Sequence, residues 1–494
     1  MRIKGSLGKG LLISLSMILI PVAAVSAQKV TPGSSCKVLN QKVVYQNKTY
    51  TCTKSGKKLI WNKGVALKPK PRPTPTATAT PTAAPTATPT AMPTATPTAT
   101  PTRVIQKRSV VSYLPPSRPS GKIDDCKIKE VSNQLTSSAR SGFPRIEPPL
   151  YANTGTIKWA LVPIDFSDLP GEVDFLNRVQ EQMDLASEWI DIVTEGKVKV
   201  VWQVQKEWIR VPGTSKDYEV ALSGTVQRPE IAKLWNTFMF ESDKIVNYRD
   251  IQAVHFILPK DQNILGEAAK GYAWDTVVKD FTTNEGSKIG FFTIPGVFYD
   301  RWDIGRNYWS YWVKEYSRGL GAGAIGAQRV GSSFQTYDVQ GNTDGERELS
   351  GWLRFLLGWM PDERVYCQQV SNLNTLELTL IPLSENSKSG LKVAIIPLSE
   401  SKAIVVESRR ESKFACLTPT QRNGVFVYLY DAKFGNTQEY LSAIIPAGRN
   451  PERYNCATNP SNDPLLHEGD SVTFEGVTVQ LLLHGDYDRI RISR

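Results

Sequence analysis

A proline-rich segment divides the chain and limits what each part can fold into. Residues 67–104 consist almost entirely of Pro, Thr and Ala, with the sequence Pro-Thr-Ala-Thr repeated. This composition cannot form a packed core and favours the extended polyproline II conformation. At about 3.1 Å per residue, the segment would reach on the order of 100 Å. The sequence therefore predicts a small module before this stalk and a large folded region after it.

The first residues have the pattern of a secretory signal. Three basic residues precede an apolar run over residues 11–25, and Val25-Ser26-Ala27 forms a cleavage sequence before Gln28. The sequence therefore predicts a signal peptide over residues 1–27 and a protein that is secreted or held at the cell surface or cell wall. An uncleaved anchor is the alternative, although the run is short for a membrane-spanning helix. A membrane is expected as a partner only if the signal segment is not cleaved.

The charges are divided as sharply as the composition. The chain carries a formal net charge of +11, but residues 1–123 contain 19 of its 59 Lys and Arg residues and no Asp or Glu. This leaves 40 basic and 48 acidic residues in the remainder, a net charge of −8. In an exported protein, a cationic segment favours anionic cell-envelope polymers over nucleic acid. We expect residues 28–123 to bind such polymers; a charge that serves solubility alone is the alternative.

Export also makes the six cysteines interpretable, because an oxidising compartment favours disulfides. The module over residues 28–66 is too small to bury much apolar surface, so a bond between Cys36 and Cys52 is expected to stabilise it. Three pairings are open to the four remaining cysteines, which are Cys126, Cys367, Cys416 and Cys456. We favour Cys416 with Cys456, because both lie in the same C-terminal region, and therefore Cys126 with Cys367.

The hydrophobic pattern changes along the large region. Apolar residues recur every three to four positions over Val173–Val193, which predicts a helix, and a second helix is expected from about Asn307 to Leu320. Residues 370–494 are nearly all strand-like and favour a β-sandwich. The predicted class is α+β, and its domains follow the signal peptide in this order: a small disulfide-linked β module over 28–66, the stalk over 67–104, a mixed domain over 105–366 and a β-sandwich over 367–494.

One motif in the second predicted helix has the spacing of a zinc-protease helix. Residues 314–321 read Lys-Glu-Tyr-Ser-Arg-Gly-Leu-Gly, against the pattern His-Glu-x-x-His-x-x-Gly. In that pattern two imidazoles one turn apart bind Zn²⁺, and the Glu between them activates a bound water. Here Lys314 and Arg318 replace the two histidines, and neither offers a lone pair at neutral pH. Glu315 remains at the position of the general base.

Several segments around this motif follow the order of a known family. They are Ala160–Asp168, Glu188–Lys197, Val198–Val204, Trp208–Pro212, Ser350–Trp359, Ala403–Arg410 and Gly424–Asp431. With them, the chain from about Trp159 to its C-terminus resembles the M6 family of secreted metallopeptidases, the immune inhibitor A-like proteases. The resemblance covers roughly three quarters of the chain.

The resemblance implies a metallopeptidase-like α/β domain followed by a β-sandwich. It also implies that the family's third metal ligand, an acidic residue after the helix, falls near Ala324. All three expected ligand positions, Lys314, Arg318 and Ala324, therefore lack a zinc-binding side chain. The chain is expected to be a degenerate member without zinc, in which Glu315 is a remnant of the general base.

An acidic loop precedes Trp352 and is a candidate calcium site. Its oxygen-bearing residues are Asp338, Asn342, Asp344 and Glu346. Oxygen ligands at this density suit Ca²⁺, but their spacing differs from that of an EF-hand. An ordinary solvated loop is the alternative. No other cofactor is expected.

Three further features are expected to be structural. The three histidines, His255, His467 and His484, lie far apart in the sequence, which argues against a histidine-built zinc site or hydrolase triad. His255 lies in the apolar run Val254–Leu258, which predicts a core strand. Glu315 is expected to pair with a neighbouring cation at an exposed site, where such a pair contributes under about 1 kcal/mol. The aromatic residues between positions 308 and 316 are expected to pack in the core, with stacking on sugar rings as the alternative.

Three functions are compatible with these features. The first is a non-catalytic binding or adhesion protein at the cell surface, built on a peptidase-like scaffold. The second is a hydrolase that still works through relocated catalytic groups. The third is a structural protein of the cell envelope. The replaced ligands at Lys314 and Arg318 favour the first.

Overall fold

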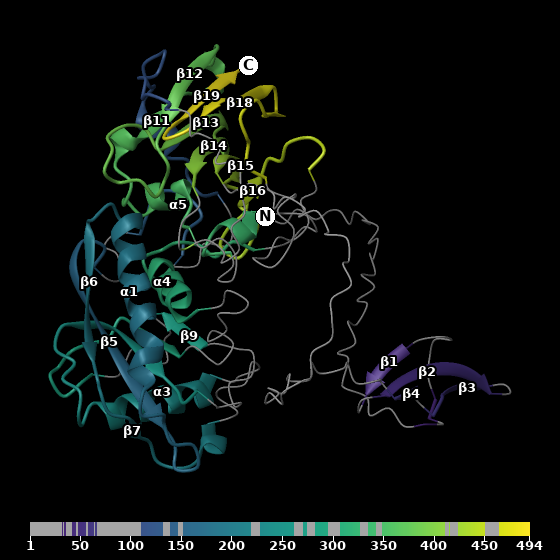
Figure 1. Cartoon of the computed structure of the whole chain (residues 1–494), viewed down its shortest axis with the longest axis vertical. Helices are drawn as coiled ribbons and strands as arrows, with labels where there is room; N and C mark the ends of the chain where they lie inside the picture. Colours follow the sequence, from purple (N-terminus) through teal and green to yellow (C-terminus); the bar gives the residue numbers. More distant parts are fainter. Residues whose placement is uncertain are drawn as a thin grey trace, which may run out of the picture. The chain divides into compact units, whose positions relative to one another are not determined.

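The computed structural model contains two units, Met1–Thr102 and Arg103–Arg494 (Figure 1). The residues that it describes are 32, 34–35, 42–45, 48–55, 58–63, 65–66, 110–131, 139–146, 152–218, 228–260, 270–273, 282–294, 307–326, 334–341, 348–410, 414, 423–449 and 464–494. The predicted signal peptide and stalk lie outside these ranges. Among the described helices, none combines the length and apolar character needed to cross a membrane.

The smaller unit contains one antiparallel sheet. Its strands are β1 (Lys42–Tyr45), β2 (Lys48–Ser55), β3 (Lys58–Trp61) and β4 (Val65–Ala66), and β2 pairs with the other three. Tyr50, Cys52 and Trp61 form its small buried core. Cys52 is disulfide-bonded, as so small a core requires. Cys36, its predicted partner, lies outside the described residues.

The first half of the larger unit is built on a six-stranded sheet in the order β6-β5-β8-β10-β9, with β7 paired to the end of β5. The pairs are parallel except that of β9 with β10. The strands are β5 (Gly155–Asp165), β6 (Val198–Val204), β7 (Ile209–Arg210), β8 (Ile251–Ile257), β9 (Lys270–Ala273) and β10 (Phe291–Ile294). Its helices are α1 (Phe175–Val193), α3 (Arg228–Ser242) and α4 (Tyr308–Gly319).

Alternate side chains of β5 enter two different cores. Trp159 and Leu161 pack with α1 and α4 on one face, whereas Ala160 and Val162 pack with α3 on the other. A strand covered by helices on both faces reads as a continuous apolar run, which is what the sequence of β5 shows. The helix predicted over Val173–Val193 is confirmed as α1, with its start two residues later.

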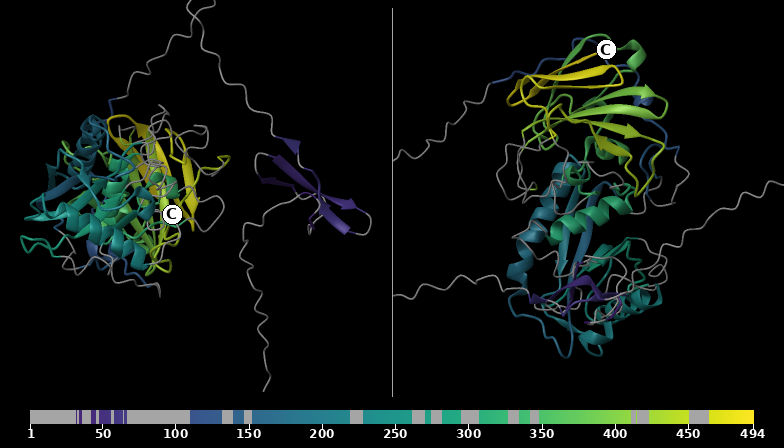
Figure 2. Two further views of the ribbon diagram at one scale, coloured as in Figure 1. Left: turned by 90° about the horizontal axis from the view of Figure 1, so that it is seen from below. Right: turned by 90° about the vertical axis from the view of Figure 1, so that its right-hand side faces the viewer.

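The second half of the larger unit contains two further sheets, drawn in green and yellow in Figures 1 and 2. Their orders are β11-β13-β14-β15-β16 and β12-β19-β18-β17. Alternate side chains of both sheets meet in one shared core. The strands are β11 (Val365–Cys367), β12 (Leu376–Leu380), β13 (Val393–Ser399), β14 (Lys402–Arg409), β15 (Gly424–Asp431), β16 (Leu441–Ala443), β17 (Ser471–Phe474), β18 (Val477–His484) and β19 (Asp488–Ser493).

Short helices complete the described structure. They are α5 (Gly351–Leu356) and the 3-10 turns η1 (Ile123–Cys126), η2 (Ser215–Tyr218), η5 (Phe334–Tyr337), η6 (Asp362–Arg364) and η7 (Val370–Asn372). The predicted mixture of helices and strands is thus confirmed at the level of an α+β protein with several sheets.

The turn between α1 and β6 joins the two halves. Glu195 and Gly196 have φ angles of 54° and 75°, a left-handed ending that favours glycine. The Glu195 carboxylate lies 2.9 Å from the Lys392 ammonium and 3.5 Å from the Arg364 guanidinium. Lys197 donates to the carbonyl oxygens of Gly358 and Trp359 at 3.0 and 2.9 Å. This turn therefore attaches the amino-terminal edge of the parallel sheet to the β-rich half.

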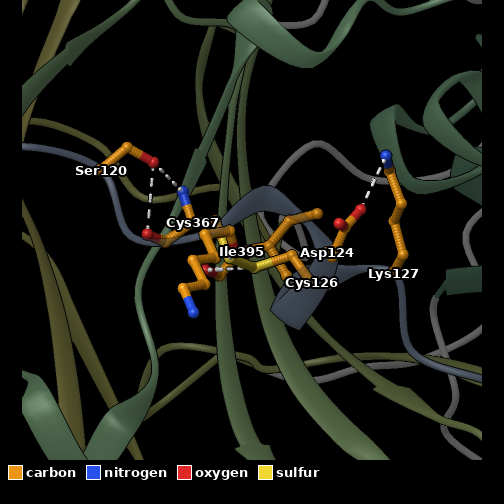
Figure 3. The surroundings of a disulfide bond; sticks show 7 residues. Ser120, Asp124, Cys126, Lys127, Cys367 and Ile395 are labelled. Carbon is orange, nitrogen blue, oxygen red and sulfur yellow. Dashed lines mark hydrogen bonds and ion pairs between the residues drawn. A yellow bond between two sulfur atoms is a disulfide. The ribbon is translucent and has the colours of Figure 1, made fainter.

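A disulfide attaches the segment before the first sheet to the β-rich half (Figure 3). Cys126 in η1 is bonded to Cys367 in β11, with a Cα–Cα distance of 5.9 Å, and both are fully buried. Ser120 and Gly121 also bond the backbone of Cys367, at 3.0 and 2.6 Å. The predicted pairing of Cys126 with Cys367 is confirmed. Cys416 and Cys456 lie outside the described residues.

We predict that the double variant Cys126→Ala/Cys367→Ala lowers the free energy of unfolding of the larger unit by about 2–5 kcal/mol, because the bond closes a very long loop. Urea denaturation followed by tryptophan fluorescence measures this loss. Cys52→Ala is the matched control, since Cys52 belongs to the other unit. An unchanged midpoint in the double variant, or an equal fall in the control, would contradict the prediction.

Candidate functional site

Helix α4 carries the motif that resembles a zinc-protease helix, and most of its side chains are buried. Trp312 and Tyr316 face the sheet, with ring centroids 5.2 Å from Trp202 and 5.4 Å from Trp159 respectively. At the start of the helix, the Tyr308 hydroxyl accepts a 2.6 Å hydrogen bond from Arg178. The prediction that the aromatic residues of this helix pack in the core is confirmed. Their size gives α4 its fixed position against β5 and β8.

Glu315 lies inside this packing rather than on the surface. It is 4% exposed, and burial raises the pKa of its carboxyl group, while the charges of Arg318 and Lys314 oppose that rise. No hydrogen bond or close ion pair joins it to another described residue. The expectation of an exposed ion pair is therefore wrong. The sheet covers one side of α4, and Gln340 bonds the Lys314 carbonyl and the Ser317 hydroxyl on another, at 2.8 and 2.7 Å.

Arg318 and Ala324, two of the three predicted ligand positions, offer no metal ligand. Arg318 is partly buried, and its Nε is enclosed without a hydrogen-bond acceptor among the described residues. The backbone of Ala324 makes two hydrogen bonds, both of 2.7 Å. Its N–H donates to Asn436 Oδ1, and its carbonyl accepts from the backbone N–H of Thr437. The helix thus places Lys314 and Arg318 one turn apart, as predicted, and the position after it is bound to the loop that follows β15.

The three histidines lie in separate places. His255 on β8 is fully buried, its ring centroid lies 4.8 Å from that of Trp159 and 5.0 Å from that of Trp312, and Nδ1 lies 2.7 Å from the Thr293 hydroxyl. Burial holds the pKa of His255 well below its usual value, so the ring is neutral. The prediction of a core histidine is confirmed.

The remaining two histidines lie in the β-rich half. His484 at the end of β18 contacts Asp488 at 2.7 Å, and the backbone N–H of His467 donates to Asp470 at 2.9 Å. Neither shares a described contact with His255. The structure therefore brings together no histidine pair at Glu315. Among the described residues, no three His, Cys, Asp or Glu side chains form a cluster that could hold a metal ion.

Asp338 of the candidate calcium loop is a structural residue. It is fully buried, and its two carboxylate oxygens accept the backbone N–H groups of Gln340 and Ser350, each at 2.7 Å. Burial raises the pKa of Asp338 to about 6, although these hydrogen bonds oppose the rise. The carboxylate therefore fixes the turn that leads into α5. Asn342, Asp344 and Glu346 lie outside the described residues.

A second polar group lies where the parallel strands end. Arg178 of α1 donates to Glu172 at 2.8 Å and to the Leu258 carbonyl at 3.0 Å, in addition to Tyr308. Arg178 thereby links the loops that follow β5 and β8. The strand order reverses between these two neighbouring strands. In open α/β sheets, ligands bind at such a switch point. The side chains here satisfy one another. Sequence reasoning missed this network, although the run of charges after the first apolar strand was a signal for it.

Comparisons with known proteins add no family. No protein-family model matches the chain, and no curated protein matches its sequence. The resemblance to the M6 family therefore rests on the sequence segments alone.

We predict that Glu315→Gln raises the free energy of unfolding at pH 7, because it removes a charge whose burial is unfavourable. The pKa of Glu315 is higher in the folded chain than in the unfolded chain. Between pH 4.5 and the pKa of Glu315 in the folded chain, the folded state therefore binds more protons than the unfolded state. The contribution of Glu315 to stability falls as the pH rises through this range. Urea denaturation between pH 4 and 8 should show a smaller fall in the variant than in the wild type.

The matched control is Glu181→Gln, which changes an exposed glutamate on α1. It should leave both the midpoint and its pH dependence unchanged. A Glu315→Gln protein that is less stable than the wild type at pH 7 would show that the carboxylate is stabilised by its cationic neighbours after all.

Proposed function

We propose that the larger unit is a degenerate M6-like peptidase with a binding or adhesion role at the cell surface. In this proposal its first half is the metallopeptidase-like domain and its two C-terminal sheets are the family's β-sandwich. The enclosure of Glu315 supports it most. A general base must reach the attacking water, yet this carboxylate is 4% exposed and under the influence of two cations.

The chemistry of the ligand positions gives the second support. Zinc in proteins takes N, S or O ligands that carry a lone pair. Lys314 and Arg318 present cations and Ala324 presents a methyl group, so the motif would repel the metal that its family requires. A working hydrolase, the alternative, would need a different set of catalytic residues.

We predict that the purified wild-type protein contains no stoichiometric zinc and does not cleave casein. The variant Lys314→His/Arg318→His/Ala324→Glu should gain zinc, because it restores three ligands around Glu315. Elemental analysis measures the metal. The single variant Lys314→His is the control and should gain none. One zinc per wild-type chain, or chelator-sensitive proteolysis that Glu315→Gln abolishes, would overturn the proposal.

We further propose that the basic N-terminal region, residues 28–123, anchors the protein to anionic cell-envelope polymers. The described part of the small unit presents Lys54, Lys58 and Lys63 at its surface. Exposed ammonium groups attract anionic chains, and salt weakens the attraction because charges are screened within about 10 Å at 0.1 M. Because the sequence predicts a signal peptide, we propose that the protein is secreted or held at the cell surface or cell wall.

We predict that Lys54→Gln/Lys58→Gln/Lys63→Gln weakens retention of the full chain on immobilised polyphosphate, and that the wild-type protein elutes as salt rises. The matched control is Lys199→Gln/Lys206→Gln/Lys260→Gln, which removes three exposed lysines of the larger unit. Equal losses in both triple variants, or retention that salt does not change, would contradict the proposed anchor.

A further inference from the structure

A hollow of about 810 Å³ lies between α3 and the loop that follows β7. Five of its lining residues occupy one side of α3 at intervals of three and four positions, at 233, 236, 237, 240 and 241. The opposite wall includes Asp217 and Tyr218 of η2. A hollow of this volume has the size of a small-molecule site. It is separate from Glu315 and from the network at Arg178.

Phe240 gives the hollow an exposed aromatic surface. Its neighbours Phe238 and Met239 are buried in the core beneath α3, but Phe240 is 59% exposed. The Lys244 ammonium lies 4.4 Å from the Phe240 ring centroid and also pairs with Glu241 at 2.6 Å. The ring is thereby held in place beside the hollow without being covered by the core. An exposed ring held in this way can stack on an apolar ligand face.

Polar groups with unused hydrogen-bonding capacity face the same space. Asp217 Oδ2 accepts from the N–H and hydroxyl of Thr214, at 2.7 and 3.0 Å, which leaves Oδ1 without a described partner. These hydrogen bonds lower the pKa of Asp217, so it stays ionised. Asn236 makes no hydrogen bond to a described residue and offers both a donor and an acceptor.

The charges around the hollow are balanced. Asp217 and Glu241 are acidic, whereas Lys233 lines the hollow and Lys244 neutralises Glu241. A strongly anionic or cationic ligand would therefore meet a like charge as well as an opposite one. The lining combines an aromatic face with a carboxylate and an amide, and a sugar ring has the complementary surface: C–H groups on its face and hydroxyl groups at its rim.

We propose that this hollow binds an uncharged saccharide, with the sugar face on Phe240 and its hydroxyl groups on Asp217 and Asn236. The proposal does not rest on the loss of peptidase chemistry, because none of these residues belongs to α4. A saccharide site would give the protein a specific contact with a glycan in addition to the electrostatic contact of its basic N-terminal region.

Isothermal titration of the full chain with chitohexaose, maltohexaose and xylohexaose tests the proposal. At least one should bind when titrated to about 10 mM, which detects dissociation constants in the millimolar range. Phe240→Ala and Asn236→Ala should each weaken that binding about tenfold, a loss of roughly 1.4 kcal/mol. Both side chains lie at the surface, so circular dichroism should show unchanged folding.

The matched control is Ile245→Ala, which removes another large apolar side chain, 61% exposed, just beyond α3. It should bind as the wild type does. The proposal is overturned if none of the three saccharides binds, if Phe240→Ala and Asn236→Ala bind as tightly as the wild type, or if Ile245→Ala weakens binding equally. These results leave the zinc and proteolysis tests of Glu315 unaffected, so the two proposals can fail separately.

Discussion

Buried charges at the turn between α1 and β6 link the two halves of the larger unit. The Lys392 side chain is fully buried, and burial, with repulsion from Arg354, lowers its pKa to about 8, while Glu195 partly offsets these effects. Removing one partner of such a pair leaves an uncompensated charge and costs about 3–5 kcal/mol. Glu195 can reach Lys392 because Gly196 allows the left-handed ending of α1. This turn therefore adds to the other links between the two halves, which are the Cys126–Cys367 disulfide and the apolar core that both halves share.

This attachment determines which edges of the parallel sheet are accessible. The amino-terminal edge of the sheet is occupied by the turn at Glu195 and by Lys197, which bonds the carbonyls after α5. The far end of α4 is bound to the loop after β15 through Ala324. The carboxyl-terminal edge carries the Arg178 network, and the hollow at Phe240 lies beside the loop after β7. Among the described residues, the lining of the hollow at Phe240 thus includes none of α4.

The burial of Glu315 illustrates how the surroundings of a carboxylate determine its properties. Glu315 lies beside Lys314 and Arg318 on α4 and is enclosed by its surroundings. A buried carboxylate is unfavourable in its charged form, which explains the raised pKa of Glu315. The same logic applies to Asp338, whose burial is tolerated because two backbone N–H groups bind it.

The sequence by itself determined local features: the helix at α1, the placement of Lys314 and Arg318 on one helix and the core position of His255. These features follow from the periodicity of apolar residues and from apolar runs, which can be read from short stretches of sequence. For Cys126 it favoured the pairing with Cys367 among three open pairings, and the structure decided it. The favoured cysteine pairing came from assigning the other two cysteines to each other. The tertiary structure alone decided the burial of Glu315, the role of Asp338 and the hollow at Phe240. The reason is physical: burial and hydrogen-bond partners come from segments distant in sequence, so no local pattern specifies them.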